Sequence, residues 1–190
     1  MKRMEPLSRD ELLTLLSAAR ESSLRDWALL LTIYAHGLRA SEAGELKRAD
    51  LNEKDWTLKI VRGKGSKTTL QTVMPNGEKL LNERKALDSW LSERPNSPYL
   101  FPNPAGGPLS RISVYNVIKK AAQASGLPGH KAAPHALRHS LGQAIHDSGQ
   151  SIEVCAEILG HSRLDSSRHY YRISFQEAND ARQVAINFRT

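Results

Sequence analysis

The sequence predicts a mainly α-helical protein that carries one small antiparallel β-hairpin sheet. Apolar residues recur at helical spacing through most of the 190 residues. Residues 56–74 instead alternate apolar and polar side chains on either side of a glycine-rich turn, as a hairpin does. The length is sufficient for one core, and no repeat or composition shift marks a boundary. We therefore expect residues 1–190 to form a single domain.

The elements are expected in the following order. A capping box formed by Ser8 and Glu11 begins a helix that ends near Arg20. A second helix ends at Gly37, and Ser41 is expected to cap a short third one. Further helices are expected at about 76–91, 110–125, 134–148, 151–159, 165–171 and 175–186. The hairpin pairs 56–60 with 69–74 through a turn at 63–65, and 95–108 is a loop rich in Pro, Gly and Asn.

Composition limits the classes of protein that the chain can belong to. The net charge of +7 fits a surface that faces DNA and fits a merely solubilising surface equally well. The single cysteine, Cys155, is expected to pack in the core and cannot form a disulfide within the chain, which suits a reducing cytoplasm. No apolar run is long enough to span a bilayer or to serve as a secretion signal. We therefore expect a cytoplasmic protein.

The last third of the chain combines side chains suited to phosphoryl transfer. His135 and Arg138 lie three residues apart at the start of an expected helix, and His161 and Tyr170 follow. Arginine binds phosphate oxygens in a bidentate fashion, and histidine moves protons near neutral pH. A tyrosine hydroxyl can form a covalent intermediate. Together they predict phosphoryl transfer through tyrosine, with no metal and no cofactor.

Two motifs upstream complete a pattern. Arg39 lies in Gly-Leu-Arg-Ala-Ser-Glu (37–42), and Lys64 lies in Arg-Gly-Lys-Gly-Ser-Lys (62–67). The order Arg, Lys, His-x-x-Arg, His, Tyr resembles that of the tyrosine recombinase catalytic domain, in the phage-integrase and Xer superfamily. Each motif alone is weak, but all of them in this order are a strong signal. The resemblance covers about residues 8–180, with a catalytic core at about 8–172.

The resemblance implies a role for each matched residue. Arg39 and Arg138 would bind the non-bridging oxygens of one phosphate, and His161 would donate a hydrogen bond to it. Lys64 would give a proton to the leaving 5′-oxygen, and His135 would handle the proton of the nucleophile. The nucleophile would be the hydroxyl of a tyrosine, and the spacing from Leu-Gly-His selects Tyr170. The matched set is Arg39, Lys64, His135, Arg138, His161 and Tyr170.

Alternatives remain at several of these positions. Lys67 competes with Lys64, since the basic residue that often follows the turn in the family is missing from 68–73, and Tyr171 competes with Tyr170. Glu42 is either a buttress for Arg39 or an acid favoured in the first turn of a helix. His139 lies four residues after His135, the spacing of a zinc pair, but a structural role is the better interpretation. The remaining histidines, at 36, 130, 146 and 169, match no motif.

The resemblance implies a site-specific recombinase that cleaves and rejoins double-stranded DNA through a 3′-phosphotyrosyl intermediate. Four protomers on two DNA sites would exchange strands, and accessory DNA-bending proteins are left open as partners. The rival interpretations are a type IB topoisomerase, a catalytically silent DNA-binding regulator on the same fold, and a helical protein–protein adaptor. The protein would act in the cytoplasm, at the nucleoid.

Two features of the chain ends bear on assembly. Most members of the family carry an N-terminal helical domain that clamps DNA, and this sequence begins almost directly at the catalytic part. We expect that domain to be absent, as in the small fimbrial-switch recombinases, which the chain resembles; the alternative is that the chain is a catalytic fragment. Residues 173–190 are expected to form an amphipathic tail helix. The family often docks this helix on a neighbouring subunit.

Overall fold

Helices α1 (Arg9–Ser22) and α2 (Leu24–Ala35) form the centre of the fold. They belong to a computed structural model that describes residues 5–63, 67–161, 166–167 and 170–171. The predicted capping box is present, with Ser8 N–H donating to the Glu11 carboxylate at 2.7 Å and Glu11 N–H donating to Ser8 Oγ at 3.2 Å. The Ser23 side chain caps α2 by accepting from the N–H of Asp26 at 3.0 Å. The two helices are therefore joined by a single capping residue, and they pack against each other.

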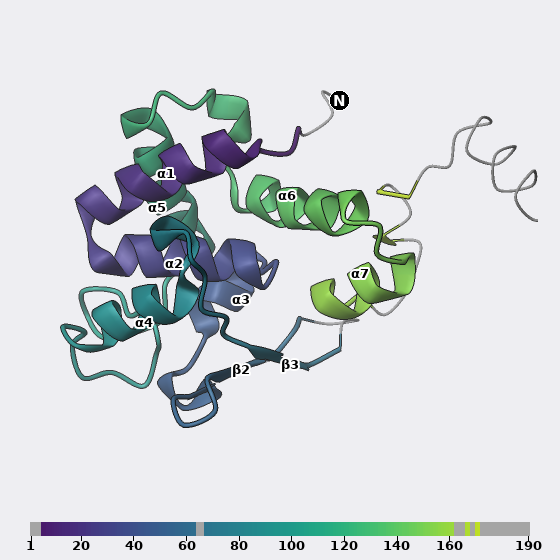
Figure 1. The fold of residues 1–190 in the computed structure, drawn as a ribbon. Coiled ribbons are helices and arrows are strands. Elements are labelled where there is room, and N and C mark those ends of the chain that lie inside the picture. The colour runs from purple at the N-terminus through teal and green to yellow at the C-terminus, as the bar shows by residue number, and fades with distance from the viewer. Residues whose placement is uncertain (1–4, 64–66, 162–165, 168–169, 172–190) are drawn as a thin grey trace, which may run out of the picture.

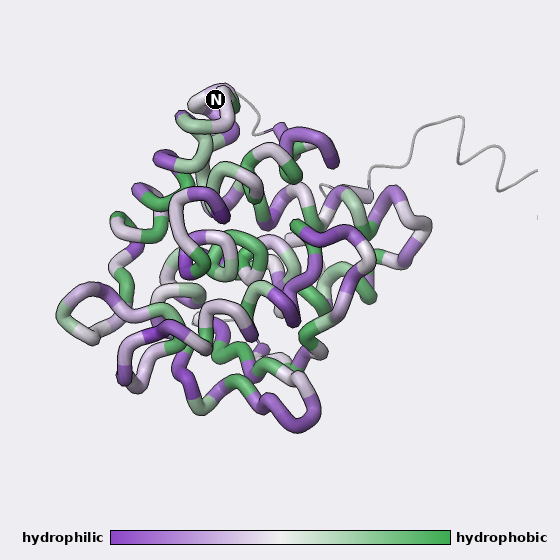
Figure 2. Tube along the Cα trace, turned by 60° about the vertical axis from the view of Figure 1, so that its left-hand side comes forward, coloured by the Kyte–Doolittle hydropathy of each residue, from purple (hydrophilic) through white to green (hydrophobic). Residues whose placement is uncertain are grey.

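The other helices cover this pair (Figure 1). Helix α4 (Glu83–Leu91) packs on α2, α5 (Arg111–Ala124) packs on α1, and α6 (Pro134–Asp147) packs on α2. Helix α7 (Ile152–Leu159) packs on α6, on the side of the sheet. Hydrophobic residues gather toward the interior of this arrangement (Figure 2), where Trp27 and Phe101 are among the largest fully buried side chains. Among the described residues, no helix is long and apolar enough to cross a membrane.

A three-stranded antiparallel sheet lies below α7 in Figure 1. It consists of β1 (Leu51–Asn52), β2 (Thr57–Ile60) and β3 (Thr69–Thr72), in that order. In the register, Leu58 pairs with Leu51 on one side and with Gln71 on the other. The predicted hairpin is confirmed as β2 and β3. Strand β1 was not predicted, because two residues are too few to show an alternating pattern.

Two predicted helix boundaries are wrong. Helix α3 (Ala40–Glu45) begins before Ser41, because the N-cap is Arg39, whose backbone N–H donates to the Glu42 carboxylate at 2.8 Å. The predicted helix over 76–91 is a 3₁₀ turn, η2 (Lys79–Leu81), followed by α4. Asn82 separates them, since its side chain caps α4 by accepting from the N–H of Lys85 at 3.0 Å.

Other boundaries agree with the sequence or lie outside the described residues. Helices α5, α6 and α7 fall within a residue or two of their predicted positions. Two further 3₁₀ turns, η1 (Arg48–Asp50) and η3 (Gly129–Lys131), were not predicted. The helix expected at 165–171 lies largely outside the described residues, and the tail helix at 175–186 lies entirely outside them.

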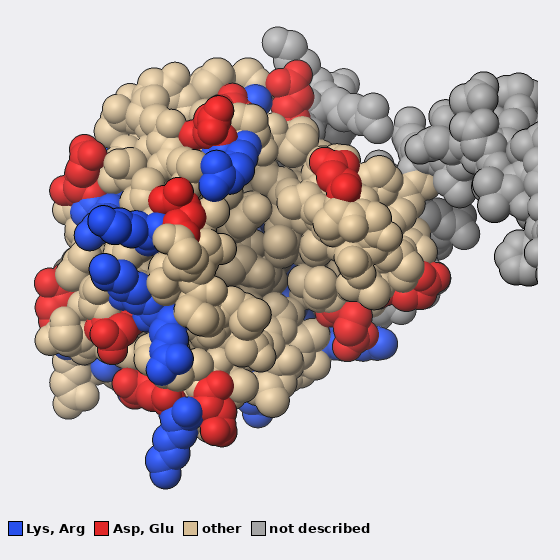
Figure 3. Space-filling model, viewed as in Figure 1, with Lys and Arg blue, Asp and Glu red and all other residues tan. Residues whose placement is uncertain are grey.

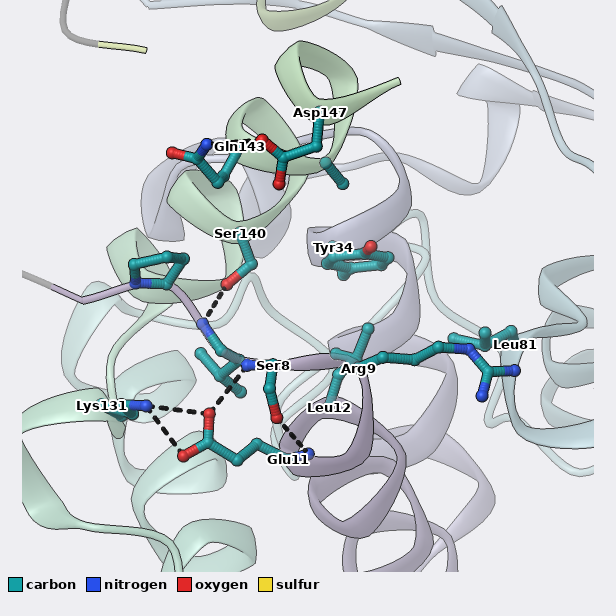
Figure 4. Close-up of a pocket in the computed structure, with 13 residues that line it drawn as sticks. Ser8, Arg9, Glu11, Leu12, Tyr34, Leu81, Lys131, Ser140, Gln143 and Asp147 are labelled. Atoms are coloured by element: carbon teal, nitrogen blue, oxygen red, sulfur yellow. Dashed lines mark hydrogen bonds and ion pairs between the residues drawn. The ribbon is translucent and has the colours of Figure 1, made fainter. Parts of the chain in front are cut away.

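The chain before α1 holds α6 in place (Figure 4). Leu7 N–H donates to Ser140 Oγ at 2.7 Å, and Lys131 Nζ lies 2.8 and 2.9 Å from the two carboxylate oxygens of Glu11. A cavity of about 540 Å³ lies beside these contacts, with Tyr34 among its lining residues. None of the predicted site residues lines it. These contacts therefore fix the helix that carries His135 and Arg138 without belonging to the predicted site.

The packing of α3 gives a test of the fold. A Cβ atom on Gly44 would lie 2.1 Å from the backbone oxygen of Leu109, so Gly44→Ala forces the two segments apart. We expect the free energy of unfolding to fall by about 1–3 kcal/mol, although alanine favours helix more than glycine does. Urea denaturation measures this loss. Gly77→Ala is the matched control, since nothing lies within 4 Å of its Cβ position, and equal stability of the two variants would contradict the packing.

Candidate functional site

The predicted site is built on the turn that ends α2. Gly37 has a φ of +57°, in the left-handed region that glycine adopts without strain. A Cβ atom at this position would lie 2.4 Å from Leu159 Cδ2 and 3.2 Å from Leu141 Cδ2. Glycine therefore lets the end of α2 contact both α6 and α7 closely. The residues predicted to bind phosphate lie on the elements that meet here.

Arg39 begins α3 and is held by Glu42. Its backbone N–H donates to Glu42 Oε2 at 2.8 Å, and its Nη1 donates to Glu42 Oε1 at 2.6 Å. The arginine side chain is 39% exposed, whereas the glutamate side chain is buried. Glu42 thus acts both as a first-turn acid and as a buttress for Arg39, which were the two roles that the sequence left open. The arrangement fixes an accessible guanidinium at a helix entrance.

Glu42 also pairs with a second arginine. Arg62 Nη1 lies 3.1 Å from Glu42 Oε2, and both side chains are buried. Burial alone would raise the pKa of Glu42, but the hydrogen bonds from Arg39 and the positive charges of Arg62 and Arg39 lower it overall. The carboxylate is therefore ionised at neutral pH and holds two guanidiniums.

Arg138 is a second buried cation of the site, beside Arg62. It lies on α6, only 3% exposed, and donates to the backbone oxygens of Gly37 and, at 2.9 Å, Leu159. Burial lowers its pKa to about 10, assisted by the positive charges of Arg39 and Arg62. Arg138 therefore stays protonated at neutral pH. Together, Arg39, Arg62 and Arg138 outweigh the one carboxylate by two positive charges, a surplus suited to an anionic ligand.

His161 contacts Arg138 directly. Gly160 ends α7 with a φ of +65°, and the following His161 N–H returns to Ala156 O at 2.8 Å. The imidazole Nε2 lies 2.7 Å from Arg138 Nη2, and Nδ1 lies 2.8 Å from Ser167 Oγ. Because a guanidinium only donates, Nε2 acts as the acceptor here and Nδ1 carries the hydrogen. Ser167 was not predicted, since no pattern in the sequence marks it.

His135 lies at the exposed start of α6, one turn before Arg138. Desolvation lowers the pKa of His135, and the charges of Arg138 and Arg39 lower it further. The imidazole is therefore mostly neutral at pH 7 and can accept a proton. The structure thus brings Arg39, His135, Arg138 and His161 into one electrostatic environment.

Tyr170 is buried against α6 and is 7% exposed. Its ring covers Gly142, where a Cβ atom would lie 2.3 Å from Cζ, and its centroid is 5.1 Å from that of the His139 ring. Burial is the largest of the causes that raise the pKa of Tyr170 to about 12. The charge interaction with Cys155 also raises this pKa, and the positive charge of Arg138 lowers it in part. Cys155 packs in the same small hydrophobic cluster, as the sequence predicts. The phenol is therefore protonated at neutral pH.

Tyr171 is held elsewhere. Its hydroxyl donates to the backbone oxygen of Ser151 at 3.0 Å, and its ring meets His146 edge-on at 4.9 Å. Ser151 caps the start of α7, whereas His161 follows its end. Helix α7 has eight residues, so its ends lie about 12 Å apart. The hydroxyl of Tyr171 is therefore anchored away from the arginines.

Lys64 lies outside the described residues, but the chain on both sides of it is attached to the site. Before it, the Arg62 side chain is buried at the site. After it, Lys67 N–H donates to Gly160 O at 3.4 Å, and Lys67 Nζ pairs with Glu157 at 3.6 Å on the surface. Among the described residues, no group of three His, Cys, Asp or Glu side chains could hold a metal ion.

Sequence reasoning missed Arg62 and Gln71. Gln71 Nε2 donates to Ile158 O at 2.7 Å, and Arg62 Nη2 donates to the same oxygen at 2.9 Å. A signal for Arg62 was present. It continues the two-residue period of Leu58 and Ile60, which places it on the buried face of the strand. Gln71 had no comparable signal, because the leucine of its strand, Leu70, is exposed and the other residues of the strand are polar.

The chain is similar to Xer recombinases over most of its length. It is 37% identical over 169 residues to tyrosine recombinase XerD of Corynebacterium glutamicum, covering 85% of this chain and 51% of the relative. It is 33% identical over 183 residues to tyrosine recombinase XerA of Pyrococcus horikoshii, covering 94% of this chain and 60% of that relative. The chain therefore spans about half the length of the first relative and somewhat more of the second.

Solved structures agree with this similarity. The pre-cleavage complex of the XerH site-specific recombinase with its difH substrate matches with a TM-score of 0.78 and 25% identity, over 96% of this chain and 55% of that one. The crystal structure of XerA recombinase matches in fold, with a TM-score of 0.74 and 23% identity, over 98% of this chain and 66% of that one. The fold is therefore that of tyrosine recombinase catalytic domains, mainly helical with one small sheet, as predicted. Since the sequence pattern of the phage integrase family also matches residues 5–177, the chain belongs to that family.

Proposed function

We propose that the chain is the catalytic part of a site-specific tyrosine recombinase, which cleaves and rejoins DNA through a 3′-phosphotyrosyl intermediate. The observation that supports this most is the convergence of Arg39, Arg138 and His161 on the turn after α2. Their positive surplus suits one phosphodiester. The similarity to XerD and XerA supports the same chemistry.

Net charge alone does not locate the DNA-binding face. On the face in Figure 3, Lys and Arg side chains lie among Asp and Glu along the left-hand side. The positive surplus of the sequence is thus not gathered into one patch on this face. The arginines of the site are a more specific signal for DNA than the total of +7, because they can bind one phosphate from two directions.

The proposed reaction conserves the energy of the broken bond. The Tyr170 oxygen attacks phosphorus while the bond from phosphorus to the 5′-oxygen breaks. The phenolic proton passes to His135, and Lys64 gives a proton to the leaving 5′-oxygen. Arg39 and Arg138 bind the two non-bridging oxygens, whose negative charge grows as phosphorus becomes five-coordinate. A 5′-hydroxyl from a partner strand then attacks the phosphotyrosine and releases Tyr170.

Two side chains must rearrange before this reaction. Tyr170 is 7% exposed, so its ring has to leave the surface of Gly142 to reach a phosphate. His161 Nε2 accepts from Arg138, so it becomes a donor to phosphate only after Arg138 turns to the ligand and Nε2 gains a proton. We propose that the DNA phosphate itself drives this exchange, because it is a better acceptor for a guanidinium than an imidazole is.

The remaining parts of the proposal concern assembly. The XerH structure is of a complex with its DNA substrate, which supports double-stranded DNA as the ligand of this chain. Strand exchange between two DNA sites requires several copies, and a tetramer on DNA with the tail at 173–190 docked on a neighbour fits that need. The reaction would take place in the cytoplasm, at the nucleoid. Accessory DNA-bending proteins are a further class of partner.

The first prediction identifies the nucleophile. Wild-type protein incubated with nicked duplexes from the DNA around its own gene should form an adduct that survives denaturation. Tyr170→Phe should abolish this adduct. Tyr171→Phe should retain it and lose about 0.5–1.5 kcal/mol of stability, because it loses one hydrogen bond, to Ser151 O. Denaturing electrophoresis measures the adduct, and its loss in Tyr171→Phe alone would move the nucleophile by one residue.

The second prediction concerns pH. Because the pKa of His135 is lowered from 6.5, the single-turnover cleavage rate should rise as pH increases below 6.5 and level off near pH 7. His135→Ala should remove this plateau. The rate should then rise roughly tenfold per pH unit up to pH 10, since attack depends on the small phenolate fraction of a tyrosine whose pKa is about 12.

The matched control for the pH profile is His130→Ala. His130 is exposed and faces Glu5 at 3.8 Å on the surface, and it matches no motif of the predicted site. Its substitution should leave the profile of the wild type unchanged. A plateau that persists in His135→Ala would show that another group accepts the phenolic proton, and His139, whose ring packs against Tyr170, is then the next candidate.

A further inference from the structure

Arg62 occupies a position that the proposed chemistry does not use. It follows β2 by two residues, and its side chain is completely buried. Its stem covers Gly160, where a Cβ atom would lie 2.7 Å from Arg62 Nε. Its guanidinium donates to four oxygens, which are His36 O at 3.1 Å, Gly37 O at 3.3 Å, Glu42 Oε2 at 3.1 Å and Ile158 O at 2.9 Å.

Two of these acceptors are shared with the predicted phosphate ligands. The backbone oxygen of Gly37 also accepts from Arg138 Nη1. The carboxylate of Glu42 also holds the guanidinium and the backbone N–H of Arg39. Arg62 therefore connects the Glu42 carboxylate, which orients Arg39, to the Gly37 carbonyl, which orients Arg138.

The third link leads to His161. Ile158 O, which Arg62 holds, lies three residues before His161 and one before Leu159, whose oxygen binds Arg138. Gln71 Nε2 donates to Ile158 O from β3 at 2.7 Å, and its Oε1 contacts His36 Nδ1 at 2.7 Å. Two side chains of the hairpin segment, Arg62 and Gln71, thus hold the end of α7 by donating to the same carbonyl. The turn that carries His161 is the next segment of the chain.

Stability alone is a weak reason for this arrangement. A buried ion pair loses the hydration of both charges, and apolar side chains of similar volume often replace such pairs without loss of stability. Arg62 Nε is also buried without a hydrogen-bond partner among the described residues. A planar group that donates in several fixed directions is, however, well suited to holding separate backbone segments in one geometry.

We propose that Arg62 is a positioning residue, which sets the separation of Arg39, Arg138 and His161 by binding the anchors of all three. It does not touch the phosphate. The role rests on the proposed recombinase function and deepens it. Gln71 assists by holding the same Ile158 oxygen.

The test is Arg62→Lys, which keeps the positive charge beside Glu42 but cannot reach four acceptors at once. We expect the single-turnover rate of adduct formation to fall roughly 10- to 100-fold, as displacement of catalytic groups by about 1 Å does. The dissociation constant for the nicked duplex should stay within about twofold, because Arg62 contributes no direct contact to DNA. The two quantities are measured on the duplex that the wild-type protein cleaves.

A second substrate separates positioning of the arginines from general damage. Replacing one non-bridging oxygen of the scissile phosphate by a methyl group gives a neutral methylphosphonate. This group develops less negative charge during attack, so it depends less on two well-placed guanidiniums. The ratio of wild-type to Arg62→Lys rates should therefore shrink on the methylphosphonate. An equal ratio on both substrates overturns the proposal, as does an unchanged rate on the ordinary duplex.

The control is Arg94→Lys. Arg94 also has a buried Nε without a partner among the described residues, and it donates to Ser97 O and Tyr99 O at 2.6 and 2.7 Å. Neither oxygen belongs to the predicted site. Arg94→Lys should lower the melting temperature, as Arg62→Lys does, and leave the cleavage rate unchanged.

Two further arms keep the test decisive. If Arg62→Lys does not fold, Gln71→Met removes one hydrogen bond to Ile158 O at similar side-chain volume. This variant should slow cleavage of the ordinary duplex several-fold. The ratio of wild-type to variant rates should again shrink on the methylphosphonate. An unchanged rate in Gln71→Met then overturns the proposal. Failure of the proposed function is seen separately, because the wild-type protein would form no adduct on any duplex, and the role of Arg62 in catalysis would fall with it.

Discussion

The site depends on the backbone oxygens at the ends of two helices. Helix α2 ends at Ala35 and is followed by its C-cap His36 and by Gly37, and the last residues of α7 are Ile158 and Leu159. The last carbonyls of a helix have no partner within it and carry the negative end of its dipole. Arg62 and Arg138 take these carbonyls as acceptors. Two buried cations are thus stabilised largely by backbone, which leaves their surplus charge available to a phosphate.

This constraint explains the close packing around the turn after α2. The left-handed conformation of Gly37 directs its carbonyl toward both arginines, and the absence of a side chain lets Leu159 approach. Gly160 has the same role at the other helix end, where the stem of Arg62 covers it. Larger residues at these glycines would separate the two carbonyl groups, so the motifs Gly-Leu-Arg and Leu-Gly-His each include a glycine for reasons of geometry.

Much of the fold was predictable because local signals decide it. The capping box at Ser8 and the periodicity of α5 to α7 placed helices within a residue or two. The start of α3 was wrong, since a carboxylate three residues into the helix capped it in place of a serine hydroxyl. Of the predicted site residues, Arg39, Arg138 and His161 lie around the turn after α2, whereas Tyr170 is covered by α6. The links between them were not predictable, because the contacts of Arg62 join residues up to 96 positions apart.

The distribution of burial indicates how the site is organised before a ligand binds. Arg138, Arg62 and Glu42 are buried and make several hydrogen bonds each through their charged groups, whereas Arg39 is partly exposed. The ion pairs of Glu42 with Arg39 and Arg62 are therefore formed in advance, and under the proposed reaction Arg138 exchanges one hydrogen bond, that with His161, for the phosphate. Tyr170 and His161 differ, because the first is covered by α6 and the second is engaged as an acceptor. Under the proposed reaction, the ion pairs that position the cations are thus set in advance. The substrate has to release the packing of Tyr170 on α6 and the hydrogen bond between Arg138 and His161.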